Sequence, residues 1–204
     1  MTQGLARCGL FRQLAPSTLR ALETLVVERD FAAGDLLLRG GGHARWLHVI
    51  ERGLVREYYV TAEGDEHTRV FIAEGGVTGS LLDLTSAAPS VTWIQALEAT
   101  HTLALPWQAF NALAADHRDL ESLARRNAEA LAVRKTLREY EMLALSAAER
   151  LARWRTAHPE LDGRITRRLL ASYLGITPVH LSWISSRRAA GATAGGRGTA
   201  PRRR

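Results

Sequence analysis

The arginines in the C-terminal part of the sequence are the residues best suited to bind a partner. Residues 146–204 carry 12 arginines and three acidic residues, a net charge of +9, whereas residues 1–145 have a net charge of −3. A guanidinium group donates to two phosphate oxygens at once, so an excess of arginine favours nucleic acid as the partner. The alternative explanation is a coding bias towards arginine together with a solvated C-terminal tail.

A helix, a tight turn and a second helix are indicated between residues 164 and 184. Ala171 is small where two helices would cross closely, and Gly175 suits the left-handed conformation that ends a helix. Thr177 is a capping residue for the second helix, and Pro178 suits its first position. The apolar residues with the spacing to fill one small core are Leu170, Leu174, Ile176, Leu181 and Ile184. This combination is typical of a helix-turn-helix, whose second helix enters the major groove of DNA; a generic helical hairpin is the alternative.

Several other kinds of site are disfavoured. A lone Cys8 excludes a disulfide framework, a cysteine zinc site and an iron–sulfur cluster ligated by this chain alone. The histidines show no paired metal spacing, and no nucleophile–base pair or phosphate loop is present, so we expect no metal, no cofactor and no enzymatic activity. No apolar run reaches membrane-spanning length and no secretory signal is seen, so a cytoplasmic protein is expected.

Short strands separated by glycine turns are predicted in the first half of the chain. Glycines recur up to Gly79, and none occurs between Ser80 and Asp162. Pro16 is typical of a helix start, and Gly64, between two strand patterns, indicates a hairpin. The predicted strands span residues 35–38, 46–51, 54–60, 68–72, 92–96 and 102–105. Their spacing favours an antiparallel sandwich or barrel.

A long helical pattern follows the strands. Its apolar residues recur with heptad spacing, at Leu123, Ala130, Val133, Leu137, Tyr140 and Ala144. Such a seam occurs in helices that pair between two copies of a chain, and also in helices packed on their own domain. Ser146 and Glu149 have the spacing of a capping box, which predicts a new helix and a hinge near residues 143–145.

These patterns divide the chain into four predicted parts. A strand-rich domain spans residues 1–118, and a long helix with its hinge spans residues 119–145. The helix-turn-helix region spans residues 146–188. The remaining residues, 189–204, are rich in arginine and poor in apolar bulk, so this tail is predicted to be disordered.

Several motifs resemble, in their order and spacing, those of one known family. They are Phe31-Ala-Ala-Gly-Asp-Leu-Leu-Leu-Arg-Gly, Trp46-Leu-His-Val-Ile-Glu-Arg-Gly-Leu-Val-Arg-Glu-Tyr-Tyr, Leu145-Ser-Ala-Ala-Glu-Arg-Leu, His158-Pro-Glu-Leu and Ala171-Ser-Tyr-Leu-Gly-Ile-Thr-Pro. Over residues 10–188 the chain thereby resembles the Crp/Fnr family of bacterial transcription regulators. The resemblance implies an α+β protein with an N-terminal antiparallel β-roll of the cyclic-nucleotide-binding type, a long dimerisation helix and a C-terminal helix-turn-helix domain. It implies double-stranded DNA, a second copy of the chain, RNA polymerase and a small-molecule effector as partners.

The first departure from the family concerns the effector. In the family that the chain resembles, members that bind cyclic nucleotide contain a Gly-Glu pair and, later in the sequence, an Arg. The Glu accepts a hydrogen bond from the ribose, and the Arg pairs with the cyclic phosphate. Ser80 and Ser90 stand at these two positions here, so cyclic AMP is not expected as the effector. The residues expected to line a pocket for another small molecule are Gly79, Ser80, Ser90, Thr92 and Thr136. A β-roll kept only as a scaffold is the alternative.

The second departure concerns the reading of bases. Trp183 stands where the family commonly has an arginine that reads guanine, a contact worth about 1–3 kcal/mol, and Val179 replaces an acidic residue. The remaining candidate groove contacts are Thr177, His180, Ser182, Trp183 and Ser186. The candidate phosphate contacts are Arg164, Arg167, Arg168, Arg187 and Arg188. Phosphate contacts carry little sequence information, so altered or weak specificity is expected.

The sequence therefore predicts a homodimeric DNA-binding transcription regulator that does not respond to cyclic AMP. No strand pattern follows Arg188, so the wing of the helix-turn-helix domain is expected to be missing. The alternative is a small-molecule-binding or protein-interaction module whose DNA-binding end has decayed, which Trp183, Val179 and the missing wing favour.

Overall fold

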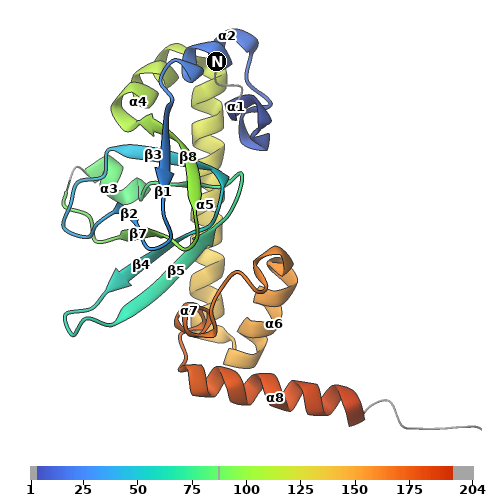
Figure 1. Ribbon diagram of the computed structural model, residues 1–204. Helices are drawn as coiled ribbons and strands as arrows, with labels where there is room; N and C mark the ends of the chain where they lie inside the picture. Colours follow the sequence, from blue (N-terminus) through green and yellow to red (C-terminus); the bar gives the residue numbers. More distant parts are fainter. Residues whose placement is uncertain (1–3, 87, 195–204) are drawn as a thin grey trace, which may run out of the picture. The chain divides into compact units, whose positions relative to one another are not determined.

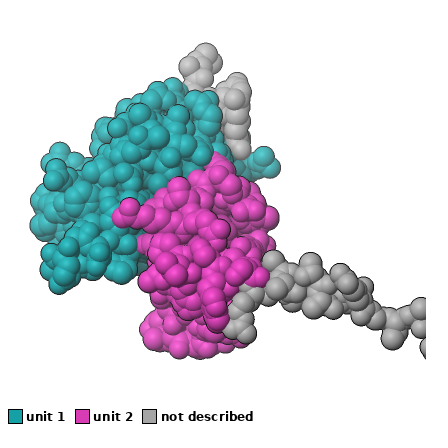
Figure 2. All heavy atoms as spheres, turned by 60° about the horizontal axis from the view of Figure 1, so that its bottom comes forward, with its two compact units in different colours: residues 1–137 teal, residues 138–204 magenta. Residues whose placement is uncertain are grey.

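The computed structural model describes residues 4–86 and 88–194 (Figure 1). The chain divides into two compact units, residues 1–137 and residues 138–204, which Figure 2 shows in different colours. The division falls within one long helix, α5 (Arg118–Ala144). Among the described residues, no helix is both long and apolar enough to cross a membrane.

Two four-stranded antiparallel sheets form the centre of the first unit (Figure 1). One has the strand order β1-β8-β3-β6 and the other the order β2-β7-β4-β5. The strands are β1 (Val27–Phe31), β2 (Leu36–Leu38), β3 (Trp46–Arg52), β4 (Val55–Val60), β5 (Glu66–Ile72), β6 (Val77–Thr78), β7 (Trp93–Ala96) and β8 (Thr100–Pro106). All six predicted strands are thereby confirmed, and β1 and β6 are added to them. The predicted hairpin is also confirmed, because β4 pairs with β5 across a turn in which Gly64 has a φ of +89°.

Two apolar clusters hold the first unit together. One cluster joins the sheets through Ile50 on β3, Val55 on β4 and Ile94 on β7. The other lies at one end of the sheets, where Figure 1 shows α1, α2 and α4 gathered. It includes Leu22 of α2 and Leu103 of β8. The helices of this unit are α1 (Gly4–Arg7), η1 (Gly9–Phe11), α2 (Pro16–Glu23), α3 (Leu81–Ser86), α4 (Trp107–Asp116) and the first part of α5.

The second unit is built from short helices. They are α6 (Ala147–Ala157), η2 (Pro159–Leu161), α7 (Arg167–Leu174) and α8 (Pro178–Ala194). The predicted capping box is present, because the Ser146 hydroxyl accepts from the Glu149 amide and the Glu149 carboxylate accepts from the Ser146 amide. The buried side chains of the unit are Leu151, Trp154, Leu161, Ala171, Leu174, Leu181 and Ile184, which includes most of the predicted small core.

The boundaries of the predicted parts differ from those of the structure in two places. The two units divide at residue 137, before the predicted hinge, because the end of α5 packs against the later helices: the Arg138 guanidinium lies 4.0 Å from the Tyr173 ring centre. Helix α8 extends to Ala194, within the segment predicted as the tail, and the alanines of residues 189–194 favour helix. Residues 195–204, with the rest of the predicted tail, lie outside the described residues.

A buried histidine in the sheet β1-β8-β3-β6 makes the stability of the folded chain depend on pH. His48 is 3% exposed, its Nδ1 lies 3.1 Å from the Thr102 hydroxyl, and its ring packs edge-on against Phe31. Burial, and secondly the charge of Arg29, lower the pKa of His48 from 6.5 to about 4. The unfolded chain therefore binds more protons than the folded chain between these values, and stability falls as the pH falls from 6.5 towards 4.

We expect a His48→Gln variant to lose this part of the pH dependence. Between pH 7 and pH 5 the unaltered chain should lose about 2 kcal/mol of unfolding free energy through His48 alone. Urea unfolding at the two pH values measures the difference for both proteins. Equal losses of unfolding free energy between pH 7 and pH 5 in the variant and the unaltered chain would show that His48 is not the source of this pH dependence.

Candidate functional site

Three of the predicted pocket residues, Ser80, Ser90 and Thr92, lie in one hydrogen-bonded network beside α3, and a fourth, Gly79, precedes Ser80 in the chain. The Ser80 hydroxyl donates to the Thr92 hydroxyl over 3.1 Å, and the Thr92 amide donates to the Ser90 hydroxyl over 3.0 Å. Gly79 has a φ of +153°, and a Cβ there would lie 2.6 Å from the carbonyl oxygen of Trp46. The structure thus brings Gly79, Ser80, Ser90 and Thr92 together, and the three side chains are buried.

Asp83 belongs to the same network, although no sequence motif locates it. Its carboxylate accepts a short hydrogen bond from the Ser90 hydroxyl, and its side chain is 3% exposed. Between Glu74 and Glu98 it is the one charged residue of the sequence, a signal that could have identified it. The charge that this network offers is therefore negative.

Thr136 lies apart from the network. It is exposed on α5, and its hydroxyl donates to the Ala132 carbonyl of the same helix over 3.1 Å. The structure therefore does not bring it together with the other four predicted pocket residues.

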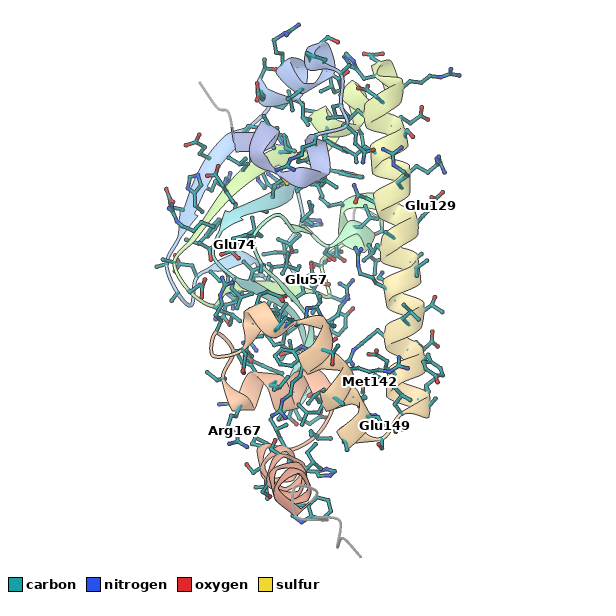
Figure 3. The ribbon with its side chains drawn as sticks, turned by 90° about the vertical axis from the view of Figure 1, so that its right-hand side faces the viewer. Glu57, Glu74, Glu129, Met142, Glu149 and Arg167 are labelled. Carbon is teal, nitrogen blue, oxygen red and sulfur yellow. The ribbon has the colours of Figure 1, made fainter. Side chains whose placement is uncertain are left out.

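A second buried polar cluster, also missed in the sequence, lies on strands of the first unit. Glu57 accepts from Arg69 over 2.6 Å and from the Thr78 hydroxyl over 2.7 Å, so both of its carboxylate oxygens are bonded. Glu57 is 5% exposed, and Figure 3 shows it among the strands. The half-buried Arg69 and the two hydrogen bonds together compensate the buried negative charge of Glu57.

The fit of a cyclic nucleotide can be tested on these groups. A cyclic phosphate is an anion and needs a cation or several donors close to it. None of the network residues Gly79, Ser80, Asp83, Ser90 and Thr92 is a cation, and the Ser90 hydroxyl donates to the Asp83 carboxylate and to the Thr92 carbonyl. These residues do not fit a cyclic phosphate; they suit a ligand that is neutral at this point or that donates hydrogen bonds.

The predicted turn between two helices is present in the second unit. Thr166 caps α7, and Gly175 ends it with a φ of +67°. Its left-handed backbone is what favours glycine there; a Cβ at position 175 would meet only the flexible end of the Met142 side chain, at 2.7 Å. The Thr177 hydroxyl accepts from the His180 amide over 3.1 Å, and Pro178 is the first residue of α8, as predicted.

The described members of the predicted nucleic-acid contacts lie on α7, on α8 and in the segments that precede these two helices. Arg167 and Arg168 are exposed at the start of α7, where Figure 3 labels Arg167, and Arg164 is half-buried. On α8 the exposed side chains are Val179, His180, Ser182, Trp183 and Ser186. Ser182 and Ser186 donate their hydroxyl hydrogens to carbonyls of their own helix, at Pro178 and Trp183. The side chains of Arg187 and Arg188 lie outside the described residues.

The heptad seam on α5 is exposed over its second half only. Leu123 is 6% exposed and belongs to the core of the first unit, and Ala130 is half-buried. Val133, Leu137 and Tyr140 are 59%, 53% and 49% exposed, and Ala144 is exposed as well. These four positions of the seam are therefore apolar side chains outside the buried core.

Comparisons with known proteins agree on the fold of the first unit. Residues 28–117 match the family model of the cyclic nucleotide-binding domain. A search of the curated proteins gives no match. FixK2 of Bradyrhizobium japonicum is similar with a TM-score of 0.68 and 20% identity over 87% of this chain and 90% of FixK2. The c-di-GMP-responsive global regulator CLP of Xanthomonas campestris is similar with a TM-score of 0.65 and 16% identity over 87% of this chain and 93% of CLP.

Regulatory subunits of cAMP-independent protein kinase A from trypanosomes are also similar. That of Trypanosoma brucei has a TM-score of 0.54 and 20% identity over 62% of this chain and 45% of the subunit, so the chain spans less than half of its length. A variant of it, with Glu, Thr and Val replaced by Ala, Arg and Ala, is bound to cAMP; its TM-score is 0.53. The Trypanosoma cruzi subunit, also at 0.53 and 20% identity, is bound to guanosine and is covered over 44% of its length. The fold of residues 28–117 is thus that of a cyclic nucleotide-binding domain.

Proposed function

We propose that the protein is a homodimeric DNA-binding transcription regulator of the Crp/Fnr type. The observation that carries the proposal is the pair α7 and α8, joined by the tight turn at Gly175, with Ala171 and Leu181 buried. In a helix-turn-helix this geometry places the second helix in the major groove. FixK2 and CLP are similar over almost their whole length, which supports the same arrangement of parts.

Charge supports DNA as the partner of the second unit. Arg153, Arg155, Arg167 and Arg168 are exposed on it. Residues 146–204 carry four times as many arginines as acidic residues. A surface of this kind neutralises phosphates and releases condensed counterions.

The exposed part of the α5 seam supports a second copy of the chain as the other partner. Val133, Leu137 and Tyr140 lie at spacings of four and three residues, so they share one face of the helix. Two copies related by a two-fold axis would present two α8 helices to half-sites about 34–36 Å apart. RNA polymerase is a further proposed partner, as in a transcription regulator generally.

Titration of mixed genomic DNA at several salt concentrations tests the proposal. If six phosphates are neutralised per dimer, log K should fall with log salt at a slope of about −5. An Arg167→Gln, Arg168→Gln variant removes four contacts per dimer, so its slope should be about −2.

The control is an Arg12→Gln, Arg20→Gln variant, which makes the same charge change at exposed positions of the first unit. Its slope should remain that of the unaltered chain. A flat salt response of the unaltered chain, or equal slopes for the two variants, would contradict the proposal and would favour the module with a decayed DNA-binding end.

We further propose that the network beside α3 takes a neutral ligand, such as a nucleoside, and excludes cyclic AMP. The trypanosome variant that is bound to cAMP has replacements at a Glu, at a Thr seven residues later and at the Val that follows. Asp83, Ser90 and Val91 have the same residue classes at the same spacing. The guanosine in the second trypanosome subunit is a nucleoside without a phosphate, which supports this ligand class.

A further inference from the structure

Two large apolar side chains are exposed at the start of α8. Val179 is 80% exposed and Trp183 is 53% exposed, and a spacing of four residues puts them on one face of the helix. The opposite face supplies Leu181 and Ile184 to the core. Val179 and Trp183 therefore present exposed apolar surface on the side of α8 that faces away from the core.

The polar groups of the same face are poorly suited to read bases by paired hydrogen bonds. Residues 178–186 contain no Arg, Lys, Asn or Gln, which are the side chains that form bidentate pairs with guanine or adenine. The hydroxyl hydrogens of Ser182 and Ser186 are directed to carbonyls of α8 itself. His180, whose ring centre lies 6.0 Å from that of Trp183, can donate or accept here, and the Trp183 indole can donate only.

The base feature that matches an apolar face is the 5-methyl group of thymine, which projects into the major groove. We propose, resting on the proposed function, that Val179 and Trp183 contact thymine methyl groups, so that the chain selects half-sites by their A·T pairs. Exposed Arg167 and Arg168 at the start of the neighbouring α7 favour DNA over an apolar protein groove as the occupant of this face.

Duplexes that differ only in the thymine methyl group test the proposal. Random 30-base-pair duplexes are enriched on the full-length chain, and the recovered sequence is synthesised with thymidine or with deoxyuridine in both strands. Deoxyuridine keeps the base pairing and lacks the methyl group. Each methyl group in contact should change the affinity about fourfold, corresponding to ~0.8 kcal/mol, so the deoxyuridine duplex should bind at least fourfold more weakly.

Variants of the two side chains locate the effect. Trp183→Ala and Val179→Ser should each reduce the difference in affinity between the thymidine and deoxyuridine duplexes. Both side chains are exposed, so the variants should fold, which thermal unfolding checks. Trp183→Arg should select G·C pairs instead, because arginine pairs with guanine. A matched control is Leu82→Ala, at an apolar residue on α3 that is 59% exposed, which should leave the difference unchanged.

The outcomes separate this inference from the function on which it rests. Equal affinity for the two duplexes, or a thymine preference that persists in both Trp183→Ala and Val179→Ser, overturns the inference and leaves DNA binding in place. Failure of the unaltered chain to enrich or bind any duplex at low salt overturns the proposed function and the inference together.

Discussion

An Asp83→Ala, Ser90→Arg, Val91→Ala variant is expected to bind cyclic AMP, which the unaltered chain is not expected to bind. The first change removes the carboxylate from the network beside α3, the second adds a guanidinium, and the third makes space beside it. Hydrogen bonds between charged groups are worth about 1.5–3 kcal/mol each, and a bidentate pair makes two. The gain in affinity for cyclic AMP should therefore be about 100-fold or more.

Calorimetric titration with cyclic AMP and with guanosine measures this change. A Val91→Ala variant is the control, because it alters an exposed residue and leaves the Asp83–Ser90 hydrogen bond in place. Thermal unfolding checks that the triple variant is folded, since Asp83 and Ser90 are buried. Cyclic AMP binding by the unaltered chain, or none by a folded triple variant, would contradict the proposal that these residues exclude the cyclic phosphate.

A Leu137→Asp variant is expected to dissociate the proposed dimer and to lose most of its DNA affinity. Leu137 is at the middle of the exposed seam, where two carboxylates would face and repel one another in a dimer. Linking two DNA-reading helices raises affinity by about 10²–10⁴ over one alone, so a monomer should bind that much more weakly. Light scattering measures the molar mass, and a shift assay measures the affinity.

The matched control introduces the same charge on the opposite face of the same helix. Ala128 is exposed and lies away from the heptad positions, so Ala128→Asp should leave the dimer and its DNA affinity intact. An unaltered chain that is monomeric at the concentrations at which it binds DNA, or equal effects of the two variants, would show that the seam is not a dimer contact.

The elements that could be predicted from the sequence are those whose signals are local. Glycine turns separate apolar strand patterns, and Ser146, Gly175 and Pro178 each have a fixed place at a helix end, so these boundaries are confirmed. Strand β1 is different: it carries Glu28, Arg29 and Asp30, and it becomes a strand through pairing with β8. Long-range pairing of this kind leaves little trace in a polar segment.

Of the two buried polar clusters, only the one that contains Ser80 and Ser90 could be predicted, because a family motif marks its positions in the sequence. Ser80 and Ser90 were found from the spacing of the resemblance, but Glu57 and Arg69 meet through the register of β4 and β5, which shifts between Glu57 and Tyr58. A heptad pattern likewise does not indicate which part of a helix its own domain covers, so Leu123 was predicted in the seam and lies in the core.

Recovery of bound genomic fragments by the purified full-length chain tests the central claim most directly. A two-fold dimer that inserts α8 into successive major grooves should enrich a palindrome whose half-sites are one helical turn apart, about 10–10.5 base pairs from centre to centre. Recovery of fragments at their input frequencies, with no shared palindrome and no loss of binding as salt rises, would contradict the account of this chain as a DNA-binding regulator.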